Sequence, residues 1–252
     1  SLARLREMLL AARQPFVLAG GSGWTVESAQ ALQRFAQKWS LPVGNAFRFQ
    51  DTFDNHHPLY AGDVGIGINP KLAARIRESD LVIAIGPRLG EMTTGGYTLL
   101  QVPRPAQRLV HIHGGAEELN RVYRADLAIN ASMGAAAGAL EALEAPAQVP
   151  WREWAQAAHA DYQANLMPQT LPGSIDMPAI VSMIQKHPPP ATVFTNVSGN
   201  FARWMHPLFE PPGLAKAHRP QSAPTNAPLC YSGTAGPRAR LGHRAPRHRT
   251  AR

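Results

Sequence analysis

The chain has 252 residues, of which 44% are hydrophobic and only 7% aromatic, with a formal charge of +8. No apolar run reaches the roughly 18 residues that a membrane-spanning helix needs, and a single cysteine, Cys230, excludes an intrachain disulfide framework and fits a reducing cytoplasm. Residues 1–202 hold 16 Lys or Arg and 16 Asp or Glu, whereas residues 203–252 hold 9 and 1. The positive charge therefore belongs to the C-terminal fifth, which argues against a nucleic-acid-binding domain.

Short apolar runs alternate with amphipathic segments along residues 1–145. Apolar spacing of three or four, with Thr25 as a cap and Pro70 in a first turn, predicts helices at Leu2–Arg13, Thr25–Trp39, Pro70–Glu78, Ala116–Tyr123 and Met133–Leu143. Compact aliphatic runs predict strands at Phe16–Ala19, Leu41–Phe47, Leu81–Ile85, Leu109–His113 and Leu127–Asn130, with a loop over Gln50–Asn69. This alternation predicts a doubly wound, Rossmann-like α/β domain whose parallel sheet is covered on both faces.

A second unit is expected after a linker at residues 146–150. Residues 151–206 contain predicted helices at Trp151–Ala164 and Ser174–His187, a strand at Ala191–Asn196 and a further helix from Ser198 to His206. They would form the truncated start of a second α/β domain. Residues 207–252 are rich in Pro, Gly and Arg, and we expect an irregular tail, either disordered or read from a shifted frame of the gene. A basic arm that binds nucleic acid or acidic partners is the alternative for this tail.

Five segments carry a family resemblance in the right order. They are VLAGGSG (17–23), HPLYAGDVGIGINP (57–70), DLVIAIGPRLGEMTTGGY (80–97), LVHIHGGAEELNRVYRADLAINA (109–131) and GSIDMPAIVSMIQKHPPPATVFTNVSGNFARW (173–204). Together they resemble thiamine-diphosphate-dependent enzymes of the acetolactate synthase and benzoylformate decarboxylase type. The first four are similar to the central domain of that family, and the fifth is similar to the start of its diphosphate-binding domain.

The resemblance implies a site for FAD or ADP on the central domain. Backbone amides at glycine loops and helix N-termini attract a pyrophosphate, and a guanidinium can lie against a phosphate or an adenine ring. The matching positions are Gly20, Gly21, Gly23, Gly65, Gly67, Gly86 and Arg88. Tight turns for the glycines and an ion pair between Arg88 and Glu91 are the alternative. Where the family often has an Asp to hold the ribose, residues 111–115 read HIHGG and the next carboxylate is Glu117, so a vestigial site is a further alternative.

Histidine pairs are the remaining candidates for metal ligands. His56 and His57 have no Cys or acidic partner at ligand spacing, which favours a solvated loop. His111 and His113 share one face of a strand, which favours packing or capping. We therefore predict no metal site in this chain.

The resemblance also implies the chemistry of the parent enzyme. Thiamine diphosphate and Mg²⁺ would make or break a C–C bond next to the carbonyl of a 2-oxo acid or a related small molecule. The equivalent strand end contacts the diphosphate, which implies contacts from Ser198, Gly199 and Asn200. Catalysis in the family needs a glutamate from an N-terminal domain and a Gly-Asp-Gly motif, and neither lies in these residues.

We accordingly expect the parent to be a cytoplasmic homo-oligomer. This chain alone is expected to be inactive, with no catalytic residue of its own. A nucleotide-binding module for FAD, ADP or NAD, or an inactive scaffold subunit, is the alternative function.

Overall fold

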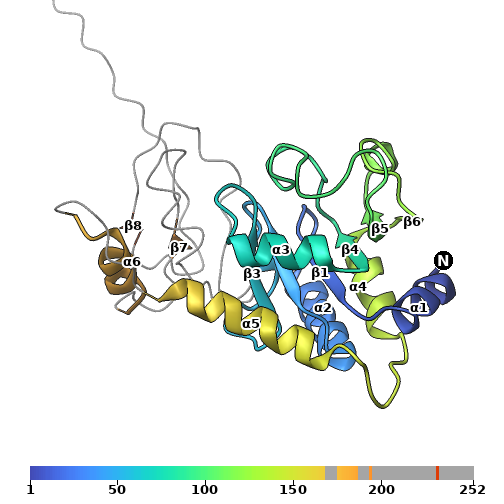
Figure 1. Cartoon of the computed structure of the whole chain (residues 1–252), viewed down its shortest axis with the longest axis horizontal. Coiled ribbons are helices and arrows are strands. Elements are labelled where there is room, and N and C mark those ends of the chain that lie inside the picture. Colours follow the sequence, from blue (N-terminus) through green and yellow to red (C-terminus); the bar gives the residue numbers. More distant parts are fainter. Residues whose placement is uncertain (168–174, 187–192, 195–230, 233–252) are drawn as a thin grey trace, which may run out of the picture.

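The computed structural model describes residues 1–167, 175–186, 193–194 and 231–232. Its centre is a six-stranded sheet in the order β3-β2-β1-β4-β5-β6, and every neighbouring pair is parallel. The strands are β1 (Pro15–Ala19), β2 (Val43–Ala46), β3 (Tyr60–Val64), β4 (Leu81–Ile85), β5 (Arg108–His113) and β6 (Leu127–Asn130). The strand order reverses between β1 and β4, which is the signature of a doubly wound sheet. The predicted fold class is confirmed (Figure 1).

Helices and short 3₁₀ turns connect the strands. Thr25 begins the second helix with a capping box in which Thr25 and Ser28 satisfy each other's backbone N–H groups. Asn69 caps the third helix, whose first position is the predicted Pro70. The helices are α1 (Leu2–Leu10), α2 (Val26–Trp39), α3 (Pro70–Glu78), α4 (Met133–Glu141), α5 (Arg152–Leu166) and α6 (Met177–Lys186), with 3₁₀ turns η1 (Gln50–Thr52) and η2 (Ala116–Glu118).

Alternate residues of the central strands enter two separate cores. Val17 and Ile83 face the layer formed by α1, α2 and α4, which contributes side chains such as Leu32. Phe16 and Val82 face the opposite layer, formed by α3 and parts of the β4–β5 connection. Because both faces are buried, the central strands consist almost entirely of apolar residues. Burying each large aliphatic or aromatic side chain contributes about 1.5–3 kcal/mol.

Two predicted elements are wrong. The loop expected over Gln50–Asn69 contains the edge strand β3, whose sequence YAGDV lacks the continuous apolar run of a central strand. The helix expected over Ala116–Tyr123 is reduced to η2. Asn120 has a left-handed φ of 60° and its side chain accepts a hydrogen bond from the Ala125 N–H at 2.8 Å, which replaces the next helical turn.

Helix α5 lies along β3 and α3 (Figure 1). Trp151 is buried and its Nε1–H donates to the carbonyl oxygen of Trp39 at 2.9 Å, while Trp154 Nε1–H donates to the carbonyl oxygen of Pro15 at 3.1 Å. The His159 ring lies 2.8 Å from the Tyr60 carbonyl oxygen, to which Nδ1 donates. Residues expected to open a second domain thus pack against the first sheet. The boundary at residues 146–150 stays a prediction.

An ion-pair cluster fastens α5 to α3, and its removal should weaken the fold. Asp161 pairs with Arg75 and, at 3.1 Å, with Lys71 Nζ; the Arg75 and Asp161 side chains are only 15% and 20% exposed. Burial raises the pKa of Asp161, but the hydrogen bonds from Arg75 and Lys71 outweigh it and leave the pKa below its usual value. Asp161→Asn should cost about 1–2 kcal/mol at neutral pH, because two cations lose their partner.

Urea unfolding at several pH values measures this loss. A carboxylate whose pKa is lowered in the folded protein stabilises the fold at pH values above the pKa that it has in the unfolded chain. The difference in unfolding free energy between wild type and Asp161→Asn should therefore shrink as the pH falls through the pKa values of Asp161 in the two states. Glu7→Gln is the matched control, because the Arg4–Glu7 side chains are 64% and 65% exposed and such pairs contribute little. An equal effect of both substitutions would show that this cluster does not hold α5.

The remaining described residues lie in the C-terminal part of the chain. Helix α6 falls within the predicted range Ser174–His187, and β7 (Val193–Phe194) within the predicted strand at Ala191–Asn196. β7 pairs antiparallel with β8 (Tyr231–Ser232), in a stretch where no strand was predicted. In the described part of the chain, no helix combines the length and the apolar character that crossing a bilayer requires.

Candidate functional site at the carboxyl edge of the sheet

The residues predicted to contact a nucleotide follow three strands of one sheet. Gly20, Gly21 and Gly23 follow β1, Gly65 and Gly67 follow β3, and Gly86 and Arg88 follow β4. All three strands are parallel, so these residues meet at the carboxyl edge, near the point where the strand order reverses. Ser198, Gly199 and Asn200 lie outside the described residues. Contact with a cofactor stays a prediction for all ten positions.

The loops after β1 and β4 touch each other through their glycines. A Cβ atom on Gly21 would lie 1.8 Å from the Gly86 carbonyl oxygen, and one on Gly86 would lie 2.2 Å from the Gly20 carbonyl oxygen. Gly21 and Gly86 have φ values of +75° and +88°, which favour glycine. The Gly20 N–H donates to the Ile85 carbonyl oxygen at 3.1 Å. Gly21 and Gly86 therefore allow the backbones of the two loops to approach each other closely.

The other glycines differ in the space around them. A Cβ atom on Gly65 would lie 2.7 Å from the Cβ of Phe47, so this position is filled by the protein itself. Gly67 has a φ of +77°. Gly23 has a φ of +90° and no heavy atom within 4 Å of a would-be Cβ. Among these loops Gly23 thus leaves room beside its backbone.

A cavity of about 220 Å³ opens beside Arg88, beyond the ends of β4 and β5. The loop after β4 supplies one wall, His111 in β5 supplies part of another, and η2 with the segment after it supplies the rest. The lining residues are Arg88, Leu89, Gly90, Tyr97, His111, Glu118, Arg121, Val122 and Tyr123. The cavity therefore combines two cations, one carboxylate, three rings and a few apolar side chains.

Glu118 is the buried charge of this cavity. Its side chain is 8% exposed, and its Oε1 lies 3.3 Å from Arg88 Nε and 2.8 Å from Arg121 Nη1. Both guanidinium side chains are largely exposed, at 71% and 63%. The ion-pair partner of Arg88 is thus Glu118 and not Glu91, as the sequence alternative proposed.

His111 and Tyr123 are buried polar side chains in the same cavity. His111 Nε2 lies 3.0 Å from the Pro87 carbonyl oxygen, which can only accept, so Nε2 carries the proton and Nδ1 is left as an acceptor. Burial lowers the pKa of His111 and favours this neutral ring. The Tyr123 hydroxyl is buried and has no partner at good hydrogen-bond geometry in the described part, although the Thr94 hydroxyl lies close enough to interact with it. Burial outweighs the neighbouring Thr94 hydroxyl and raises the pKa of Tyr123.

Both histidine pairs are engaged in local contacts. His113 Nδ1 accepts from the Gly115 N–H at 2.9 Å, so His113 caps a turn. His56 Nδ1 lies 3.3 Å from Asp54 Oδ1 on an exposed loop, whereas the His57 ring packs edge-on against Phe53. No three His, Cys, Asp or Glu side chains of the described ranges are grouped so that they could hold a metal ion.

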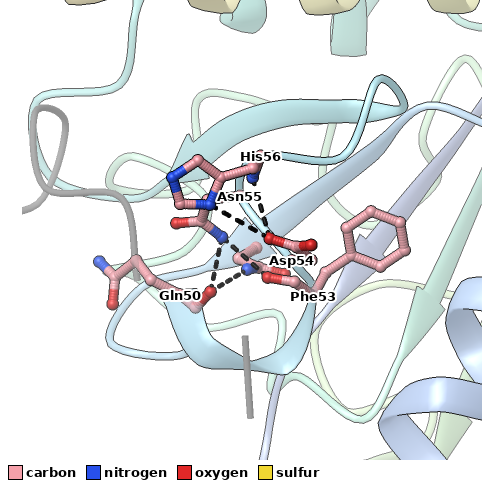
Figure 2. A network of polar contacts seen from close by, with 6 residues as sticks. Gln50, Phe53, Asp54, Asn55 and His56 are labelled. Atoms are coloured by element: carbon pink, nitrogen blue, oxygen red, sulfur yellow. Dashed lines mark hydrogen bonds and ion pairs between the residues drawn. The ribbon is translucent and has the colours of Figure 1, made fainter. Parts of the chain in front are cut away.

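A polar network at the end of β2 lies on the same edge of the sheet (Figure 2). The side-chain amides of Asn45 and Asn55 both donate to the Gln50 carbonyl oxygen, at 2.7 and 2.8 Å. Since a carbonyl only accepts, Asn45 Nδ2 must face it, and the buried Oδ1 has no partner in the described residues. Asp63 is the register neighbour of Asn45 in β3, and its Oδ1 is likewise buried without a partner there. Burial raises the pKa of Asp63 to about 8.

The sequence did not point to Glu118, Arg121, Tyr97 or Tyr123. The first carboxylate after the strand, Glu117, is exposed, whereas Glu118 turns inward at the end of η2. The spacing of three between Glu118 and Arg121 is an ion-pair spacing and was the one available signal. The tyrosines come from separate turns and carried no such signal.

Comparison with known proteins assigns the family. The sequence pattern described as "Thiamine pyrophosphate enzyme, central domain" matches residues 2–143, which run from the start of α1 to just beyond α4. The chain belongs to the thiamine pyrophosphate enzymes. The predicted resemblance to this family is therefore confirmed, and the doubly wound sheet is its central domain.

Several members of the thiamine pyrophosphate enzyme family align with part of the chain. 3D-(3,5/4)-trihydroxycyclohexane-1,2-dione hydrolase 2 of Bacillus cereus is 35% identical over 103 residues, 40% of this chain. The 3D-(3,5/4)-trihydroxycyclohexane-1,2-dione hydrolase of Bacillus anthracis is 32% identical over 101 residues. The enzyme with this name from Bacillus thuringiensis (strain Al Hakam) is 34% identical over 103 residues, and each match covers 40% of this chain. The matched segment spans 16% of the length of each relative.

Proposed function

We propose that this chain is the central-domain part of an enzyme that uses thiamine diphosphate to act on 2-oxo acids or related carbonyl compounds. The match of residues 2–143 to the family's central domain carries the proposal. Thiamine diphosphate, held through Mg²⁺, would supply a nucleophilic ylid carbon and a cationic thiazolium ring that accepts electrons from the carbon of a carbonyl group. The relatives' names extend the candidate substrates to polyhydroxylated cyclic 1,2-diones.

The domain would serve this chemistry by binding and positioning. Its described side chains include no group that we propose as catalytic. Ser198, Gly199 and Asn200 remain the proposed contacts to the diphosphate, and the 252 residues contain no Gly-Asp-Gly for Mg²⁺. We therefore propose that catalysis needs further segments, within a cytoplasmic homo-oligomer that acts on a small molecule. An inactive scaffold subunit is the competing proposal.

Reading the encoding DNA in all three frames from Trp151 onward is the first test. We expect another frame to continue with Gly-Asp-Gly and a downstream Asn. Since the glutamate that the family's catalysis needs does not lie in these residues, the readout is cofactor binding: the protein expressed from that frame should bind thiamine diphosphate in calorimetry only when Mg²⁺ is present. If no frame contains the motif, or the expressed protein binds no thiamine diphosphate, the scaffold or nucleotide-module proposal replaces this one.

We further propose that the cavity beside Arg88 binds the adenosine part of FAD or ADP. Its volume of about 220 Å³ is below the roughly 300–1,000 Å³ of pockets that enclose a whole ligand, so part of the nucleotide would remain outside. Charged and polar side chains, among them Arg88, Glu118 and His111, line the cavity, which fits a polar ligand. Arg88 and Arg121 would meet phosphate oxygens at the rim, and Tyr97, 42% exposed, offers a face for the adenine ring.

Calorimetric titration with ADP tests the nucleotide site. We expect saturable binding that weakens about tenfold in Arg88→Ala, because a charge-assisted hydrogen bond contributes about 1.5–3 kcal/mol. Arg124→Ala is the matched control, because it removes the same charge from an exposed residue that does not line the cavity. If wild-type protein shows no saturable binding at millimolar ADP, or both variants weaken it equally, the cavity is not the nucleotide site.

A further inference from the structure

Three buried oxygen atoms without a partner in the described residues belong to the β2–β3 side of the sheet, whereas the cavity beside Arg88 lies beyond β4 and β5. They are Oδ1 of Asn45 in β2, Oγ1 of Thr52 in η1 and Oδ1 of Asp63 in β3. The Asn45 and Thr52 residues are 0% exposed. A buried polar atom that the protein leaves unpaired costs free energy, and a bound water or ion is the usual explanation.

The side chains of Asn45 and Asp63 are neighbours on one face of the sheet. The two residues pair in register in the parallel strands β2 and β3. The residues that follow them, Ala46 and Val64, both enter the core on the α3 side, and successive residues of a strand face opposite sides. Asn45 and Asp63 therefore share the other face, toward α2.

The turn η1 fixes the direction of the Asn45 amide. Asn45 Nδ2 donates to the Gln50 carbonyl oxygen at 2.7 Å, in the network of Figure 2. This bond leaves Asn45 Oδ1 as an acceptor to which no described group donates. η1 begins at Gln50, ends at Thr52 and lies against β2, so the Thr52 hydroxyl belongs to the same end of the strand.

Asp63 brings the one charge among these three oxygen atoms. No ion pair of the described residues includes Asp63, and burial alone raises its pKa. Buried carboxylates in proteins are paired or coordinate metal ions, and carboxylate, amide and hydroxyl oxygens suit hard cations. A monovalent ion balances a single carboxylate. A divalent ion would leave a buried positive charge, and Mg²⁺ also gives up its water reluctantly.

We propose that Asn45 Oδ1, Thr52 Oγ1 and Asp63 Oδ1 bind a monovalent metal cation, Na⁺ or K⁺, which fastens the edge strand β3 to β2. Water would complete the coordination shell. The site is separate from the proposed nucleotide site and takes no part in the proposed thiamine diphosphate chemistry. Its role is to stabilise the fold at the carboxyl ends of these two strands.

Urea unfolding of the whole chain in three chloride salts, at constant pH and ionic strength, tests the site. Tetramethylammonium is the reference cation, because it is too large to fit among buried side chains. We expect about 0.1 M Na⁺ or K⁺ in its place to lower the unfolding equilibrium constant of wild type about tenfold, which corresponds to a dissociation constant of about 10 mM.

Asp63→Asn removes the charge, keeps the shape of the side chain and should abolish the effect of the ion. Each protein is compared with itself in the three salts, so the difference in stability between the two proteins does not enter. Asp54→Asn is the matched control. It removes a partly exposed carboxylate beside the same network, and it should keep the tenfold effect.

Equal stability of wild type in all three salts overturns the proposal and leaves a water molecule as the occupant. An ion effect that survives in Asp63→Asn, or that Asp54→Asn loses to the same extent, indicates diffuse attraction of cations and overturns the proposal as well. If Asp63→Asn does not fold, as judged by circular dichroism, Thr52→Val takes its place, because it removes one ligand oxygen and no charge.

Discussion

Asp63→Asn is expected to stabilise the protein at neutral pH by roughly 2–4 kcal/mol. Asp63 lies near the end of β3, where its Oδ1 is buried without a partner in the described residues. Burial raises its pKa from 3.8 to about 8, so the folded protein holds the carboxyl group in its protonated form at neutral pH. The unfolded chain has lost that proton, and folding must take it up again.

The sign of the pH dependence follows from this difference. A carboxyl group with a raised pKa in the folded state costs nothing below the unfolded pKa near 3.8, and the cost grows until the pH reaches about 8. Each pH unit between these two pKa values lowers the unfolding free energy by about 1.4 kcal/mol, and partial exposure of the side chain reduces the total loss. Asn has a similar shape and does not titrate, so Asp63→Asn removes this pH dependence of the stability.

Urea unfolding of Asp63→Asn and wild type near pH 5, 7 and 9 measures the effect. The advantage of the variant should grow between the first two values and level off near the third. Glu91→Gln, in an exposed loop, should change stability by less than about 0.5 kcal/mol throughout. If Asp63→Asn gains nothing at the highest pH, the Asp63 carboxylate is paired in the folded protein and the argument from burial is wrong.

The two buried strands at the centre of the sheet show what sequence can predict. β4 agrees with the predicted range Leu81–Ile85 at both ends, because a strand buried on both faces must be a continuous aliphatic run. The cap of α2 was predicted at Thr25 for a similarly local reason. β3, by contrast, lies at the edge of the sheet and contains Gly62 and Asp63. These residues interrupt the continuous apolar run by which a buried strand is recognised in the sequence.

The site was predictable only in part. Strand–loop–helix order placed Gly20, Gly86 and Arg88 at one edge of the sheet, since parallel strands end together. It could not show that the first two loops touch, because that contact depends on the distance between backbones. Nor could it show that Glu118 faces Arg88, because Glu118 lies in the short turn η2 that takes the place of the predicted helix.

Gly21→Ala should destabilise the protein by about 3 kcal/mol or more, enough to prevent folding at moderate temperature. Its Cβ would lie 1.8 Å from the Gly86 carbonyl oxygen, far inside van der Waals contact. Relief would require the loops after β1 and β4 to separate. This separation would strain the hydrogen bond of 3.1 Å that the Gly20 N–H donates to the Ile85 carbonyl oxygen. The bond lies at the centre of the sheet, where the strand order reverses.

Gly23→Ala separates this clash from the cost of an unfavourable φ. Gly23 has a φ of +90° but no heavy atom within 4 Å of the added Cβ. Gly23→Ala should therefore lower the unfolding free energy only by the cost of holding Ala at this φ, about 1–2 kcal/mol. Thermal unfolding followed by circular dichroism compares the two variants with wild type. A melting temperature of Gly21→Ala that equals that of Gly23→Ala would mean that the loops can part freely. The carboxyl edge between β1 and β4 would then be an adaptable opening, and Gly20, Gly21 and Gly86 would again be available to a pyrophosphate.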